Sequence, residues 1–183
     1  MGPRAVTVGT AQGMTEGQRR TVAVWAADCA DRVLPLFEAE APGDDRPRDA
    51  IARSRAFARG ELSAAGEIRR RFVAGRAAGS AATPAGRAAA RAAAQAAGVA
   101  HMGAHALGAA AYAAVAVGLA HPDDPRARDR EVTQQLALLS PAATSALRSL
   151  PLLGTDTAGP LGPGLLAAGD LGAVIRQVQA ALA

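Results

Sequence analysis

Two histidines, His101 and His105, stand four positions apart in the middle of an Ala- and Gly-rich segment that runs from residue 84 to residue 120. On a helix this spacing places both imidazoles on one face. Such a pair can bind zinc, act as a general base, or line a ligand cleft. It can also be a pair of buried polar side chains that hold neighbouring helices together.

A zinc site is weakly supported. A structural zinc ion takes four protein ligands and a catalytic one usually takes three. The chain has no HExxH or CxxC motif that would supply the remaining ligands. We therefore expect no metal or cofactor, and His101 and His105 are the only metal candidates that we name.

Small and polar residues share the side of the helix that carries the histidines, namely Gly98, Gly108 and Tyr112. Such a stripe suits a close crossing with another helix, and it also suits a narrow cleft for a small molecule. Trp25 could complete the lining of that cleft. Packing with internal hydrogen bonds is the more common outcome of such a pattern.

Charged candidates lie in the first third of the chain. Asp28 can pair with Arg32 one helical turn later, or reach a cation on another helix. Arg46 and Arg48 flank Pro47 in a turn, where they could clamp a carboxylate or a phosphate or simply face solvent. Cys29 falls on an apolar stripe, which predicts a buried and unreactive thiol.

Composition predicts an all-α protein. The chain has 183 residues with 3% aromatics and a net charge of +4, and all of its 20 basic residues are arginine. Alanine and arginine favour helix, whereas strand-forming residues are sparse. One cysteine and no apolar leader indicate a cytoplasmic protein, and no segment is apolar enough to span a membrane. An arginine run at 69–71 lacks the interleaved aromatics of a nucleic-acid stacking surface, so we expect no nucleic-acid partner.

Helix boundaries follow from capping residues and from Gly and Pro. Residues 1–14 are expected to be a flexible tail and residues 15–183 a single helical domain. Thr15 and Gln18 form a capping box, Gly60 ends a helix, and Thr83 and Ser140 cap two others. The expected architecture is a compact bundle of about seven helices around the Ala/Gly-rich one, with a Gly/Pro-rich loop at 150–168. The expected helices are 15–40, 46–59, 62–78, 84–120, 126–139, 141–149 and 170–182.

Three blocks, WAADCADRVLPLF at 25–37, RPRDAI at 46–51 and AHMGAHALGAAAYA at 100–113, carry a family resemblance together with GPLGPGLLAAG at 159–169. They resemble the bacterial Imm-five-like family of immunity proteins. The resemblance implies an all-helical, non-enzymatic protein that neutralises a toxin by binding it, and it transfers no catalytic residue. Relatives also carry the label exonuclease SbcC, but the ATPase of such a nuclease needs a GxxxxGK[ST] loop, and this chain has no lysine.

Two hypotheses of different classes follow. The first is a protein that binds a toxin partner stoichiometrically, with the residues around Asp44, Asp45 and Asp49 or the arginine-rich faces as recognition surfaces. The alternative is a helical domain that binds a small molecule or a metal through His101, His105 and Tyr112. An enzyme with a histidine base is weaker, because no nucleophile, carboxylate dyad or cofactor motif accompanies the histidines.

Overall fold

The computed structural model describes residues 11–70 and 72–183, and over these ranges the chain forms helices and no strand. This confirms the all-α prediction. The helices are α1 (Glu16–Glu38), α2 (Arg46–Ala58), α3 (Ala64–Arg70), α4 (Val73–Ala77), α5 (Pro84–Gly98), α6 (His105–Ala120), α7 (Ala127–Ala137), α8 (Pro141–Arg148) and α9 (Gly169–Leu182), with 3-10 turns at Ala78–Ser80 and Leu165–Ala167.

The predicted capping residues begin the helices for which they were named. Thr15 and Gln18 form the capping box of α1, in which each side chain accepts a hydrogen bond from the other residue's backbone amide. Thr83 and Ser140 cap α5 and α8, and a proline follows each of them as the first helical residue. Gly60 has a φ of +82°, the left-handed conformation that ends α2 without the cost of a Cβ.

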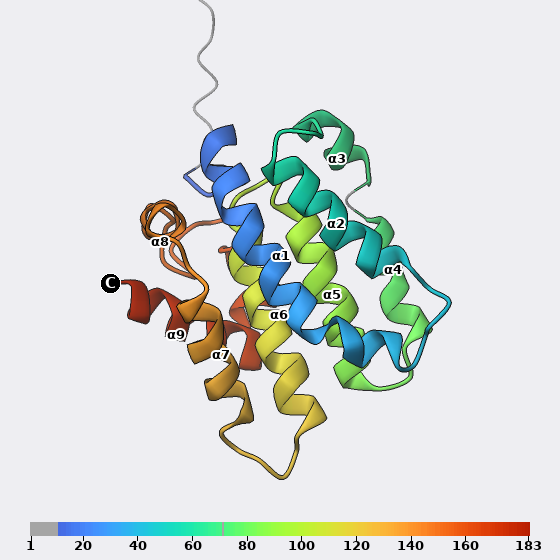
Figure 1. Ribbon diagram of the computed structural model, residues 1–183. Coiled ribbons are helices and arrows are strands. Elements are labelled where there is room, and N and C mark those ends of the chain that lie inside the picture. The colour runs from blue at the N-terminus through green and yellow to red at the C-terminus, as the bar shows by residue number, and fades with distance from the viewer. Residues whose placement is uncertain (1–10, 71) are drawn as a thin grey trace, which may run out of the picture.

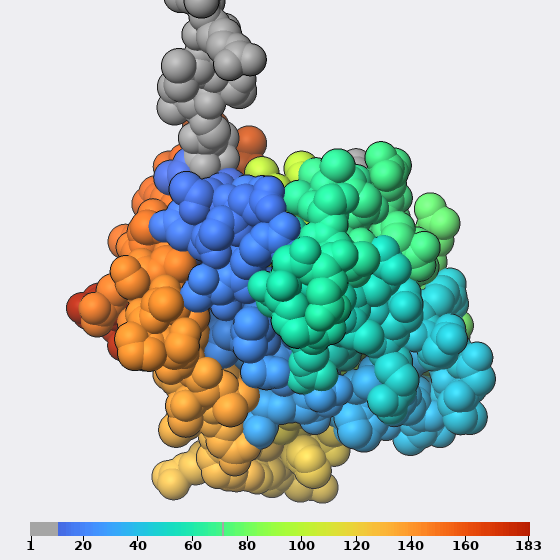
Figure 2. Space-filling view, turned by 45° about the horizontal axis from the view of Figure 1, so that its top comes forward, coloured from blue at the N-terminus to red at the C-terminus, as the bar shows by residue number. Residues whose placement is uncertain are grey.

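Helix α1 lies across the α5–α6 pair, with α2 to α4 on one side and α7 to α9 on the other (Figure 1). The space-filling view shows the first turns of α1 between the green α2–α3 region and the orange segment that contains α8 (Figure 2). Alanines wall the centre of this arrangement, and most of those on α5 and α6 are fully buried. Because a methyl group is so short, the axes of these helices can approach the lower end of the usual ~8–10 Å spacing.

The expected single helix over 84–120 is wrong. The chain leaves α5 at Gly98, turns through residues 99–104, and returns as α6 against the helix it has just left. The amides of Gly103 and Ala104 donate to the carbonyls of Gly13 and Gln12, at 3.2 and 3.0 Å. A distant segment thus takes donors that a continuous helix would use, which is why helical periodicity alone did not reveal the break.

The expected flexible tail is also too long. Residues 1–10 lie outside the described residues, but Gln12 is 2% exposed and is held by the long loop. Its side-chain amide donates to Asp156 and to the carbonyl of Ala158, and its oxygen accepts from the amide of Leu161 at 2.9 Å. Residues 11–14 therefore belong to the folded unit. The expected helix 62–78 is likewise divided, into α3 and α4.

The Gly/Pro-rich loop wraps the bundle. Leu161 is fully buried, and Gln179 of α9 binds the loop at two points, donating to the carbonyl of Pro151 and accepting from the amide of Leu153. Two glutamine side chains thus supply hydrogen bonds that the loop cannot form by regular secondary structure.

Replacing the buried Gln12 with alanine should lower the free energy of unfolding by about 1–3 kcal/mol, because the buried amide of Leu161 loses its acceptor. Urea unfolding followed by circular dichroism measures this change. Gln177→Ala, at an exposed glutamine of α9, is the matched control and should stay within about 0.5 kcal/mol of wild type. Equal stability of Gln12→Ala and wild type would show that residues 11–14 do not hold the loop.

Candidate functional site

A groove opens where the α5–α6 hairpin turns, and α4 forms its other wall. Its volume is about 740 Å³, and it is open to solvent on one side. Both histidines singled out in the sequence face it. The described residues that line it are Phe72, Gly75, Arg76, Ala94, Gln95, Gly98, His101 and His105.

Two glycines allow the hairpin to close beneath this groove. A Cβ on Gly98 would lie 3.0 Å from the ring of His105, so the imidazole of α6 packs directly on the α5 backbone. A Cβ on Gly108 would collide with the amide of Gln95, so the amide of α5 packs on the α6 backbone in the same way. The small-and-polar stripe predicted from the sequence therefore builds a close helix crossing, but the crossing lies between the two halves of the predicted helix.

His105 is a neutral side chain with a fixed orientation. Its Nδ1 lies 2.8 Å from the oxygen of Gln95. Because that oxygen can only accept, Nδ1 carries the proton and Nε2 is left as an acceptor. Burial, together with the smaller effect of the neighbouring His101, lowers the pKa of His105 to about 4. His105 therefore carries no charge at neutral pH.

His101 lies in the turn and is exposed, so it is not the buried core residue that one continuous helix would have made it. The centroids of the two imidazole rings are 6.5 Å apart. The pair thus shares one groove, as the spacing predicted, although only His105 is on a helix. Over the described residues, no cluster of three or more His, Cys, Asp or Glu side chains is placed to hold a metal ion.

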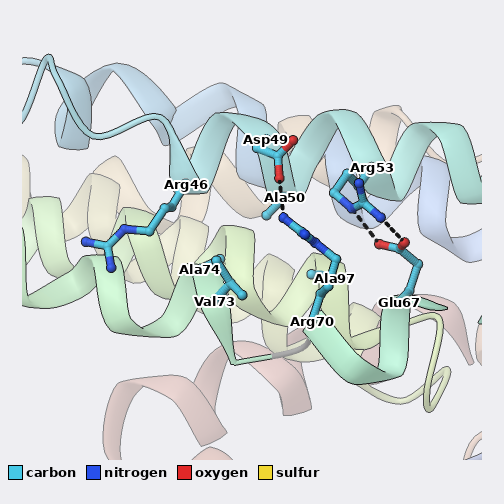
Figure 3. A pocket seen from close by; sticks show the side chains of 9 residues that line it. All are labelled: Arg46, Asp49, Ala50, Arg53, Glu67, Arg70, Val73, Ala74 and Ala97. Carbon is cyan, nitrogen blue, oxygen red and sulfur yellow. Dashed lines mark hydrogen bonds and ion pairs between the residues drawn. The ribbon is translucent and has the colours of Figure 1, made fainter. Parts of the chain in front are cut away.

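Ion pairs between α2 and α3 hold the chain that leads into the groove wall (Figure 3). Arg53 binds Glu67 through two hydrogen bonds, the shorter at 2.6 Å, and Glu67 is only 7% exposed. Arg70 lies 3.3 Å from Asp49 beside them. The space left among these side chains is about 10 Å³, which is room for at most one water molecule. This cluster is therefore a structural contact and not a ligand pocket.

The other aromatic candidates lie away from the groove. Tyr112 is 5% exposed, and burial raises the pKa of its hydroxyl. Trp25 is 2% exposed and donates its indole N–H to the carbonyl of Gln135 at 2.8 Å. The structure thus does not bring Tyr112 or Trp25 to the histidines, so the predicted four-residue lining does not form.

The charged candidates are paired within the molecule. Asp28 binds Arg55 of α2 at 2.8 Å, and Arg32 binds Glu131 of α7 instead of Asp28. The two arginines expected in a turn lie instead in the first turn of α2, where Arg46 binds Asp44 at 2.5 Å and Arg48 binds Glu38 at 2.6 Å. The hydrogen bonds from Arg46 hold the pKa of Asp44 well below its ordinary value. Arg46 and Arg48 therefore have carboxylate partners of their own and do not form an empty clamp.

Cys29 is fully buried beside this network. Burial, reinforced by the charges of Glu131 and Asp28, raises the pKa of its thiol well above the ordinary value. The unreactive thiol expected from the apolar stripe agrees with this environment.

Several buried polar residues were not identified from the sequence. Gln135 is fully buried and donates to the carbonyl of Ala110 and to Glu131, so it joins α7 to α6. Glu131 and Gln135 are four residues apart on α7, with the buried Val132 between them. This spacing of two polar residues on an apolar helix face is the sequence pattern that could have identified them. No such pattern identifies Gln95. The sequence predicts that Gln95 and His105 belong to one continuous helix, in which residues ten apart do not meet.

Comparison with known proteins gives one family. The family model described as "Imm-5 like putative immunity protein" matches residues 12–142, which is more than half of the chain. Neither the curated proteins nor the solved structures include a significant match. In the part of the chain that the structure describes, no helix combines the length and apolar character needed to cross a membrane.

The lowered pKa of His105 predicts a pH dependence of stability. The unfolded chain takes up a proton near the ordinary value of 6.5, whereas the folded chain does so only near 4. The stability that the neutral His105 contributes to the folded state is complete above pH 6.5 and is lost as the pH falls toward 4. Between pH 7 and pH 5, His105 should cost wild type about 2 kcal/mol of unfolding free energy.

Urea unfolding of wild type and His105→Gln at the two pH values isolates this effect, because carboxylate contributions are common to both proteins. The stability difference between wild type and His105→Gln should shrink by about 2 kcal/mol at pH 5. His121→Gln, in the loop between α6 and α7, removes an exposed imidazole and serves as the matched control. The same slope for His105→Gln and wild type would contradict a buried neutral imidazole.

Proposed function

We propose that this protein neutralises a toxin by binding it. The premise of this proposal is that the chain belongs to the Imm-5 like family of immunity proteins, as the family match establishes. The match over residues 12–142 is the observation that carries the proposal. It includes α1 to α7 and therefore the whole α5–α6 hairpin with its groove.

Association, and not chemistry, is the mode of action that we infer. Among the described residues that line the groove there is no serine, cysteine or carboxylate beside the histidines. His105 has one nitrogen engaged by Gln95, and a base with a pKa near 4 is mostly unprotonated but weak at neutral pH. Such a site supports recognition better than proton transfer.

We place this interaction in the cytoplasm. The one cysteine of the chain, Cys29, is buried and unpaired, which suits a reducing compartment. A toxin that acts on its own producer would meet the protein there. In this proposal the partner is a protein, and the interaction needs no cofactor.

The test begins with the genes beside the one that encodes this chain. If one of them encodes a toxin that stops growth, co-expression with this protein should restore growth. Purified toxin should lose activity in proportion to added protein, with complete inhibition at about one equivalent.

The titration endpoint separates binding from catalysis. An enzyme that modifies or degrades the toxin would inactivate a large excess over time, whereas a binding protein stops at equimolar amounts. Toxin recovered from the complex by denaturation and refolding should be active again and unchanged in mass. Inactivation by a few hundredths of an equivalent, or no neutralisation by the protein, would overturn the proposal.

A further inference from the structure

We propose that the groove between α4 and the α5–α6 turn is the docking surface for an acidic segment of the partner protein, with an apolar side chain beside its carboxylates. This inference rests on the proposed function, since it assigns the surface through which the toxin is bound. It is carried by a cation that has no ion pair with the described residues, an exposed aromatic residue and a preorganised floor, all in one hollow.

The charge of the groove is unbalanced. Arg76 lines it, is exposed, and makes no ion pair with any described residue. Arg91 is also exposed and without an ion pair among those residues, one helical turn before Gln95 on the same face of α5. No carboxylate belongs to the described lining. The surface of the groove is therefore cationic.

Elsewhere in the described chain, most arginines bind a carboxylate or a backbone carbonyl. Arg32 and Arg53 hold buried glutamates, and Arg148 donates to the carbonyl of Leu182. A fold that neutralises most of its arginines and leaves Arg76 open in a hollow provides a place for an external carboxylate. A charge-assisted hydrogen bond there would be stronger than one between neutral groups, and the positive surface would steer an acidic partner toward it.

An aromatic side chain stands next to this cation. Phe72 is 60% exposed and is the N-cap residue of α4. It lies four residues before Arg76, so the two side chains project from the same side of the helix. Beside them Gly75 and Ala94 present no long side chain, and a Cβ on Gly75 would only just touch Ala94, at 3.8 Å. Aromatic residues and arginine are the types that contribute most to protein–protein binding energy. An apolar side chain of the partner would remove Phe72 from water.

The floor of the groove is already ordered. His105 is fixed between the backbone at Gly98 and the oxygen of Gln95, and the alanines of α5 and α6 hold the hairpin beneath it. Binding therefore costs little ordering on this side of the interface. The free Nε2 of His105 can accept a hydrogen bond from an N–H of the incoming segment.

The size of the hollow favours a stretch of chain over a single ion. Its volume of about 740 Å³ lies within the ~300–1,000 Å³ of pockets that enclose drug-sized ligands. A second copy of this chain is a poorer occupant, because each copy carries a net charge of +4. A partner with an acidic segment matches both the size and the charge.

Two groove variants and two matched controls test the inference against the toxin encoded by the neighbouring gene, in a catalytically inactive form. Arg76→Glu reverses the groove charge and Phe72→Ser removes the apolar contact. Arg126→Glu makes the same charge reversal at an exposed arginine before α7, and Leu138→Ser makes the same kind of truncation at a leucine that is 45% exposed. Isothermal titration calorimetry gives each Kd, and circular dichroism confirms that each variant is folded.

Each groove variant should weaken binding at least about tenfold, and each control should stay within about threefold of wild type. Raising the salt concentration should weaken wild-type binding more than binding by Arg76→Glu. A crystal structure or cross-linking map of the complex should place an Asp- or Glu-containing segment of the toxin against Arg76.

The outcomes distinguish this inference from the proposed function. If wild type neutralises the toxin and the groove variants bind as well as the controls, the groove is not the docking surface but the proposed function stands. If wild type neutralises no neighbouring toxin, the proposed function is overturned and the docking surface with it. If light scattering shows a wild-type dimer that Arg76→Glu dissociates, the groove is a self-association surface and the inference is wrong.

Discussion

The close approach of α5 and α6 is the constraint on which the rest of the molecule depends. Two helices walled by alanine can pack tightly, but their contact offers few side chains large enough to fix one register. Gln95 and His105 supply that register, because each occupies the space that a glycine leaves on the opposite helix. A half-buried amide and a half-buried imidazole lose part of their hydration, and here each provides the other with a hydrogen-bond partner. One hydrogen bond thus fixes the hairpin, and the hairpin supports α1 above it.

The peripheral elements are fixed in the same way. The indole of Trp25, the amide of Gln135 and the Arg32–Glu131 pair connect α1, α6 and α7, while Gln12 holds the long loop. A core built mainly of methyl groups contributes burial that is much the same for several neighbouring registers. Buried polar groups distinguish between them, because a shifted register would separate these groups from their hydrogen-bond partners. In this protein, alanine packing therefore stabilises the helical bundle, and polar contacts specify the register in which its helices pack.

This division explains what the sequence could predict. Helix ends marked by Thr15, Thr83, Ser140 and Gly60 were confirmed, because a cap acts through residues that are adjacent in the chain. The family resemblance was confirmed over residues 12–142. The break at 99–104 was not predicted, since an Ala-rich pattern has the same periodicity in one helix as in two, and the acceptors that stabilise the turn come from residues 12 and 13. The ion pair partners of Arg32 and Asp28 depended on packing in the same way, because Glu131 and Arg55 lie far from them in the sequence.

The break in the helix also creates the candidate site. In one continuous helix, His101 and His105 would lie a turn apart along a straight surface, with no second wall. Because the chain reverses at Gly98, the turn projects beside α4, and the histidines, Gln95 and Arg76 come to border one hollow. The register that satisfies His105 also holds it neutral, so the charge of the groove comes from its arginine and not from that imidazole. The contact that closes the hairpin therefore also sets the charge of the groove, which has an arginine at its rim and an uncharged imidazole in its floor.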